Sequence, residues 1–203
     1  MTKTEKAVTW AIEIANDPAH GYDQDNRWGP DYDCSSLVIS AWQQAGVPVK
    51  TKGAYNTKSM KSVFLSCGFK DVTSSVNLDN GSGMKRGDVL LNIARHTVMH
   101  IGNGKVVSAS INENGGAHGG TPGDQNGNEI KIQNYYNCPW DCVLRYNEDS
   151  TSTRIQNHSQ LLEMPKSAKV RVMPINLPIL ASPLPGKEML PLRKQLLKFF
   201  RQL

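Results

Sequence analysis

Residues 32–42 read Tyr32-Asp33-Cys34-Ser35-Ser36-Leu37-Val38-Ile39-Ser40-Ala41-Trp42, and this stretch decides the fold. Leu37, Ala41 and Ala45 recur every four residues, which gives a helix one apolar face, and Gly46 is a typical helix end. A cysteine in the first turn of that helix faces unpaired backbone N–H groups and the positive end of the helix dipole, both of which favour the thiolate. The position of Cys34 therefore indicates a reactive thiol, with a buried structural thiol as the alternative.

The net charge of +5 is unevenly distributed along the 203 residues. Of the 23 basic and 18 acidic residues, nine and two lie in residues 151–203, which leaves 14 basic and 16 acidic residues in 1–150. This near-neutral front part offers no nucleic-acid surface. The sequence contains no run of about 18 apolar residues, so no membrane-spanning helix is expected. The first residues lack the apolar core of a signal peptide, so we expect synthesis in the cytoplasm and export by another route.

The remaining pattern predicts helices first and strands later. A helix is expected over 4–16, a polar loop over 20–33 and a third helix near 57–67, followed by a loop-like stretch over 70–85. Strands are expected over 87–92, 96–101, 105–110, 129–136 and 141–146, with Gly102-Asn103-Gly104 as a hairpin turn and 111–128 as a glycine-rich loop. This order predicts an α+β fold with a mainly antiparallel sheet.

A cysteine nucleophile needs a base from elsewhere in the chain. His96 opens a predicted strand, and His100 shares its face because strand side chains alternate. The helix-packed face of this strand holds one of two sets, and the pattern leaves both open: His96, Val98 and His100, or Thr97, Met99 and Ile101. A lone strand histidine is more often structural than catalytic. The presence of Cys34 at a helix start favours the catalytic interpretation of His96.

Several motifs follow one another in order. They are Tyr22-x-x-Asp25-x-Arg27-x-Gly29-Pro30-x-Tyr32-Asp33-Cys34-Ser35-Ser36, Lys85-Arg86-Gly87-Asp88-Val89, His96-Thr97-Val98-Met99-His100-Ile101-Gly102-Asn103-Gly104, the block from Gly123 to Ile130 and the block from Pro139 to Tyr146. Together they resemble the cysteine peptidoglycan hydrolases of the NlpC/P60 superfamily, and most closely its phage-lysin branch. The resemblance spans roughly residues 4–147, which we take as the catalytic domain, 1–147.

The resemblance implies a papain-like α+β fold in which N-terminal helices pack on the sheet. Cys34 would be the nucleophile and His96 the general base. Tyr22 would hold the oxyanion together with N–H groups at the helix start. The implied activity is that of an endolysin, which cleaves an N-acetylmuramoyl–L-alanine amide or a stem-peptide bond of bacterial peptidoglycan without metal or cofactor. It would act at the cell wall after release from the host cell.

The third catalytic position departs from the superfamily pattern. A histidine, or a glutamate or asparagine in relatives, usually stands twelve residues after the base, where this chain has Ser108. A serine hydroxyl can accept from an imidazole N–H but carries no charge. The alternatives for this role are Ser110, Asn112, Glu113 and Asp124. Two other functions remain open: an acyltransferase on the same fold, and a wall-binding module whose site has decayed, which Ser108 would fit.

Residues beside the nucleophile are candidates for substrate binding. Asp33, Ser35 and Ser36 either contact the substrate amide or cap the helix. Trp28 either stacks on substrate or belongs to the core or its rim. The other cysteines, Cys67, Cys138 and Cys142, match no zinc spacing and are expected to be reduced, with a Cys138–Cys142 disulfide as an open alternative.

The end of the chain changes in composition. Residues 148–165 are predicted to be a polar linker, and residues 166–203 a proline-rich basic tail that is poorly ordered. From about residue 188 the tail becomes amphipathic and basic. Three interpretations stand: a disordered tail, a weak contact with anionic wall polymer or membrane, or a segment that results from a reading-frame slip. The sequence does not indicate an oligomeric state.

Overall fold

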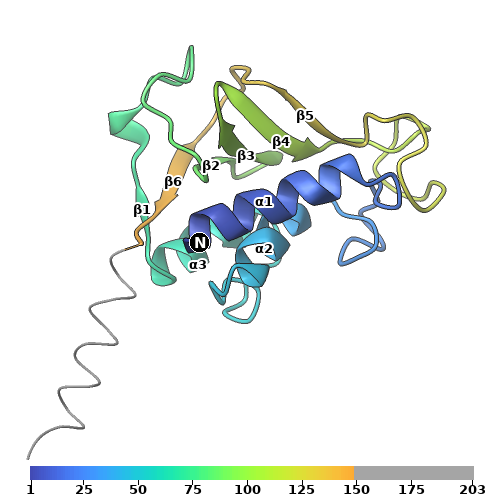
Figure 1. Ribbon diagram of the computed structural model, residues 1–203, viewed down its shortest axis with the longest axis horizontal. Coiled ribbons are helices and arrows are strands. Elements are labelled where there is room, and N and C mark those ends of the chain that lie inside the picture. Colours follow the sequence, from blue (N-terminus) through green and yellow to red (C-terminus); the bar gives the residue numbers. More distant parts are fainter. Residues whose placement is uncertain (149–203) are drawn as a thin grey trace, which may run out of the picture. The chain divides into compact units, whose positions relative to one another are not determined.

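A computed structural model describes residues 1–148 and confirms the α+β architecture (Figure 1). Three helices come first, α1 (Lys3–Asn16), α2 (Cys34–Gln44) and α3 (Thr57–Ser66). Six strands follow: β1 (Phe69–Asp71), β2 (Val89–Asn92), β3 (His96–Gly102), β4 (Lys105–Ala109), β5 (Ile130–Asn134) and β6 (Cys142–Tyr146). The predicted linker over 148–165, apart from Glu148, and the predicted tail over 166–203 lie outside the described residues.

The six strands form one sheet in the order β1-β6-β2-β3-β4-β5, and all neighbours are antiparallel. The predicted hairpin joins β3 to β4, with Asn103 in the left-handed region at a φ of 52°. The prediction of loop over 70–85 was wrong at its start, where β1 pairs with β6 and a 3-10 turn, η1 (Thr73–Ser75), follows. A three-residue strand is too short to show an alternating pattern, and tertiary pairing alone reveals it.

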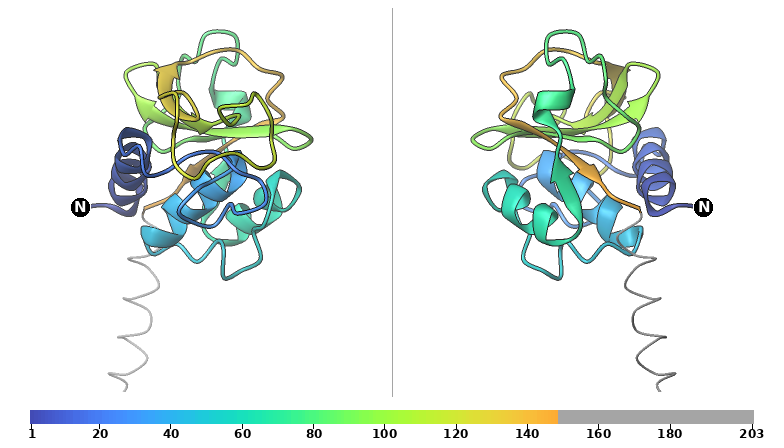
Figure 2. Two further views of the ribbon diagram at one scale, coloured as in Figure 1. Left: turned by 90° about the vertical axis from the view of Figure 1, so that its right-hand side faces the viewer. Right: turned by 90° about the vertical axis from the view of Figure 1, so that its left-hand side faces the viewer.

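The three helices pack on one face of this sheet (Figures 1 and 2). α1 lies along β4 and β5, α2 lies against β3, and α3 contacts β1, β2 and β6. Thr97, Met99 and Ile101 face the helices, which settles the alternative that the sequence left open. Val98 lies on the opposite face in a second apolar cluster with Leu90, Val106, Trp140 and Val143. No helix within residues 1–148 is long and apolar enough to span a bilayer.

The start of α2 is fixed by a capping box. The Asp33 side chain accepts a hydrogen bond from the Ser36 N–H at 2.6 Å, and the Ser36 hydroxyl accepts one from the Asp33 N–H at 2.9 Å. Such a cap stabilises a helix by about 1 kcal/mol. At the other end of α2, Gly46 adopts a φ of 80°. The cap makes Cys34 the first helical residue, at the end of α2 where backbone N–H groups have no partner within the helix.

Candidate functional site

The Cys34 side chain is buried at the helix start, with 7% of its surface exposed. Backbone N–H groups of Thr97 and Ser35 point at its sulfur. Burial nevertheless raises the pKa of the Cys34 thiol to about 11, and the nearby negative charge of Asp33 adds to the rise. The thiol is therefore protonated at neutral pH in the free protein. It needs a base before it can act as a nucleophile.

His96 is the residue before Thr97, whose N–H contacts the cysteine. Its ring is half-buried and stacks on Trp140, with centroids 6.2 Å apart and planes 24° apart. Burial lowers the pKa of His96, while the charge of Asp33 opposes that change. The imidazole is thus neutral at pH 7, which is the form that can accept a proton.

The segment that carries Trp140 is tied to the start of the hairpin. Asn92 donates to the Pro139 carbonyl at 2.6 Å, and the Asp141 N–H donates to the Leu91 carbonyl at 2.8 Å. Because β2 pairs Asn92 with His96, these bonds set the indole beside the imidazole. His100, in contrast, is 5% exposed, and its Nδ1 lies 3.1 Å from the Lys85 carbonyl.

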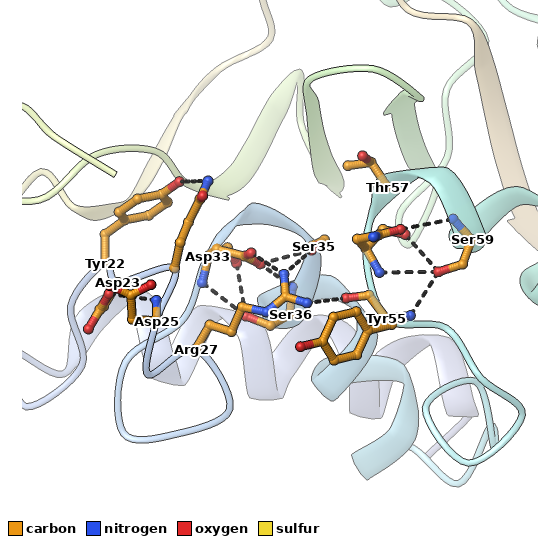
Figure 3. Close-up of polar contacts among 12 residues, drawn as sticks. Tyr22, Asp23, Asp25, Arg27, Asp33, Ser35, Ser36, Tyr55, Thr57 and Ser59 are labelled. Atoms are coloured by element: carbon orange, nitrogen blue, oxygen red, sulfur yellow. Dashed lines mark hydrogen bonds and ion pairs between the residues drawn. The ribbon is translucent and has the colours of Figure 1, made fainter. Parts of the chain in front are cut away.

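A buried ion pair supports the start of α2 (Figure 3). One guanidinium nitrogen of Arg27 donates to the Asp33 carboxylate and to the Ser35 hydroxyl, the latter at 3.3 Å. The other donates to the Tyr55 carbonyl at 2.5 Å. Arg27 is 9% and Asp33 3% exposed. The Asp33 carboxylate accepts three hydrogen bonds, and the one from the Ser36 N–H makes Asp33 the helix cap. Contacts of Asp33, Ser35 and Ser36 with substrate stay a prediction.

Arg27 is the residue of this site to which the sequence assigned no role. It appears in the motif that ends at Cys34, six residues before Asp33. The signal was a basic residue inside a loop that otherwise carries acids and amides. Its positive charge lowers the pKa of Cys34, against the effect of Asp33, so it partly shields the thiolate from that carboxylate.

Tyr22 lies close enough to the cysteine for their charges to interact. Burial, with smaller contributions from the charges of Cys34 and Asp33, raises the pKa of the Tyr22 phenol to about 12. The phenol oxygen accepts a hydrogen bond from the Gln24 amide at 3.1 Å, and Figure 3 shows the phenol turned toward its partner. A phenol that keeps its proton is a donor suited to an oxyanion.

Hydrogen bonds join the loop that carries Tyr22 to the glycine-rich loop 111–128 and to Glu129, which follows it. The Glu129 carboxylate, 1% exposed, accepts from the Tyr22 N–H at 2.9 Å and the Gln125 N–H at 3.1 Å. Asp31 accepts from the N–H groups of Gly21 and Gly123, at 2.7 and 3.0 Å. These bonds hold two distant segments together. Between the segments lies a cavity of about 270 Å³, lined by Tyr22, Asp23, Asn26, Gly29, Pro30, Asp31, Gly119, Gly120, Thr121 and Pro122.

Ser108 lies on β4, on the sheet face that also carries Val98. It is fully buried, accepts from the Gln133 amide at 3.3 Å and is hydrogen-bonded to Tyr136. Ser110, Asn112, Glu113 and Asp124 all follow β4 in the chain. Three of them make hydrogen bonds within the glycine-rich loop or at its end: Asn112 to the Gly119 carbonyl, Glu113 from the Thr121 N–H and Asp124 from the Gly127 N–H. Of the five candidates for the third catalytic position, Ser108 is therefore the one that lies in the strand next to β3.

Trp28 lies at the surface, half-buried, near the ion pair. The Lys50 ammonium lies 4.0 Å and the Arg27 guanidinium 5.2 Å from the centroid of its indole. All four cysteines are free thiols. Within residues 1–148 no group of three or more His, Cys, Asp or Glu side chains is arranged to hold a metal ion.

The chain is similar to one protein family and to several solved structures. The profile of the endolysin-like domain family matches residues 29–107 and 106–161. Among solved structures, NlpC1 from Trichomonas vaginalis is 18% identical with a TM-score of 0.42, and the match covers 71% of this chain and 44% of that protein. The peptidoglycan hydrolase RipB from Mycobacterium tuberculosis is 19% identical with a TM-score of 0.42, over 70% and 65% of the two chains. The chain thus spans less than two thirds of the length of these proteins. No curated protein matches the sequence.

Proposed function

Because the chain belongs to the endolysin-like domain family, we propose that it hydrolyses an amide bond of bacterial peptidoglycan with Cys34 as the nucleophile. The observation that carries this proposal is the placement of the thiol. Cys34 is the first residue of a capped helix, and the backbone N–H of Thr97, next to the neutral His96, points at its sulfur.

The first half of the reaction forms an acyl-enzyme. His96 takes the proton of the Cys34 thiol as the sulfur attacks the carbonyl carbon of the substrate amide. The negative charge that develops on the carbonyl oxygen is stabilised by N–H groups at the start of α2 and by the Tyr22 hydroxyl. The imidazolium then gives its proton to the leaving amine, and the C–N bond breaks.

The second half regenerates the enzyme. His96 takes a proton from water, whose oxygen attacks the thioester, and the departing sulfur recovers that proton. Trp140 keeps the imidazole in place through stacking, and Ser108 is an uncharged third member. The N-acetylmuramoyl–L-alanine amide and a stem-peptide bond are both substrates of this mechanism. We place the action at the cell wall, after release of the protein from the cytoplasm.

The test compares four purified proteins on Gram-positive cell walls, with mass spectrometry of the soluble fragments. Wild type and Cys67→Ala, which removes a half-buried thiol at the end of α3, are expected to release the same fragments. Cys34→Ala and His96→Ala are expected to release none. New L-alanine amines together with peptide-free muramic acid identify an amidase, and shortened stem peptides identify an endopeptidase. Release by Cys34→Ala at the wild-type rate would refute the proposed nucleophile.

A further inference from the structure

Two aromatic rings next to the ion pair form a surface that the proposed reaction does not use. We name it the aromatic platform and define it as Trp28 and Tyr55 with the cations Arg27 and Lys50. The two ring centroids lie 5.8 Å apart. We propose that this platform is a subsite for an N-acetylated sugar ring of the glycan strand. The inference rests on the proposed peptidoglycan substrate and adds a contact with its carbohydrate part.

The platform is held rigid from below. The Arg27 guanidinium lies 4.3 Å from the centroid of the Tyr55 ring and donates to the carbonyl of the same residue (Figure 3). The Tyr55 N–H donates to the Ser59 hydroxyl at 2.8 Å, just before α3. Backbone and ring of Tyr55 are therefore both fixed before any ligand arrives. Such preorganisation lowers the entropic cost of binding.

The exposure of Tyr55 distinguishes it from a core residue. Its surface is 60% exposed, whereas that of Arg27 beneath it is 9% exposed. A ring with a buried cation on one side and an accessible remainder offers a flat apolar contact area with a polar edge. The Lys50 ammonium, at the Trp28 ring, adds a donor next to this area.

The chemistry of a pyranose ring fits this surface better than that of a stem peptide. One face of an amino-sugar ring presents C–H groups that pack on an aromatic ring. Its hydroxyl and acetamido oxygens accept hydrogen bonds from an ammonium such as that of Lys50. A stem peptide consists of short aliphatic and charged residues and has no such flat face.

The platform connects to the nucleophile through consecutive contacts. The Tyr55 ring packs on Arg27, Arg27 pairs with Asp33, and Asp33 caps the helix that begins with Cys34. A sugar on the platform therefore lies next to the ion pair that holds the start of α2. We expect a glycan held there to favour cleavage at the muramoyl amide over bonds farther along the stem.

Binding of carbohydrate without turnover tests the proposal. Calorimetric titrations use Cys34→Ala as the parent, with two probes: the N-acetylglucosamine tetramer and a peptide released from the glycan. The second substitutions are Tyr55→Ala, Tyr55→Phe, which keeps the ring, and Leu65→Ala, which removes a similar exposed apolar side chain farther along α3. We expect Tyr55→Ala to weaken tetramer binding about tenfold, and the other two to change it less than about twofold.

The outcomes separate this inference from the proposed hydrolysis. Equal tetramer affinity of the parent and the Tyr55→Ala variant would overturn the sugar subsite, as would no tetramer binding by the parent. If Tyr55→Ala weakens binding of the peptide but not of the tetramer, the sugar subsite is also overturned. No step of the titration needs catalysis. If the Cys34→Ala parent binds the tetramer through Tyr55 and the wild type cuts no wall, the hydrolase proposal alone is refuted.

Discussion

Replacement of Arg27 by methionine tests whether the buried ion pair holds the start of α2. Methionine keeps the length and apolar stem of the side chain but removes its charge and donors. Asp33 then keeps its hydrogen bonds from the Ser35 hydroxyl and the Ser36 N–H. It loses its salt bridge to Arg27, the one cation paired with it within residues 1–148. The substitution also removes the donors that Arg27 supplies to the Ser35 hydroxyl and the Tyr55 carbonyl.

The expected loss follows from the burial of the pair. Breaking a buried ion pair by removal of one partner costs about 3–5 kcal/mol. Because the helix cap still satisfies part of the Asp33 carboxylate, we expect the lower end, about 3 kcal/mol of the free energy of unfolding. In a chain of this size that loss corresponds to a decrease in Tm of about 6–12 °C. Loss of the Arg27 charge also raises the pKa of Cys34, so kcat/KM falls as well.

Urea unfolding followed by tryptophan fluorescence measures the effect, since Trp42 is fully buried in the core. The matched control is Lys61→Met, which breaks an exposed pair with Asp71 whose side chains are 38% and 36% accessible. We expect it to cost less than about 1 kcal/mol. In the Arg27→Met/Asp33→Asn double variant, the asparagine still caps the helix, so its loss should be smaller than the sum of the two single losses. A loss below about 1 kcal/mol for Arg27→Met would refute the structural role of the pair.

Three further predictions concern the same region. Gly21→Ala should destabilise the protein by more than about 2 kcal/mol in urea unfolding, since a Cβ there would lie 2.1 Å from the Gly123 carbonyl oxygen. The control is Gly116→Ala, whose Cβ meets nothing closer than 3.5 Å. Equal losses of stability in the two variants would contradict the close approach at Gly21. Alkylation of Cys34 in the free protein, read by peptide mass spectrometry, should rise with pH toward a midpoint near 11, because burial disfavours the thiolate; a midpoint at or below 9 would show that the N–H donors outweigh burial. Ser108→Ala should lower kcat by less than about tenfold, because its hydroxyl is uncharged; complete inactivity of a folded variant would make Ser108 essential.

The fold was predictable where local patterns are long and consistent. The apolar stripe and cysteine of α2, the Gly102-Asn103-Gly104 turn and the helices-then-strands order each have a local cause in the sequence. β1 has none, because its three residues become a strand only through pairing with β6. The sequence also left open which face of β3 packs on the helices, for a similar reason. Both of its alternating sets contain apolar side chains, and the apolar cluster on the far side of the sheet is built from distant residues such as Trp140.

The sequence named candidate site residues but not the residues that support them. Motif resemblance pointed to Cys34, His96 and Tyr22, whose chemistry depends on residue type. The role of Arg27 depends on Asp33, Ser35 and a backbone carbonyl at Tyr55, and no pattern in one sequence announces such a convergence. Sequence reasoning likewise did not single out Tyr55, because an exposed tyrosine in a loop is ordinary until its buried cation is seen.

The bonds that fix the Tyr22 loop also set an order of events during synthesis. Tyr22 is anchored by Glu129, 107 residues later, and Gly123 reaches Asp31 across 92 residues. A ribosome that has made α2 has already made the reactive thiol, but it has not yet made the carboxylate that positions the phenol. The nascent chain thus lacks the anchor of the Tyr22 loop until Glu129 has emerged, so the proposed oxyanion site is assembled only after nearly the whole domain has been translated.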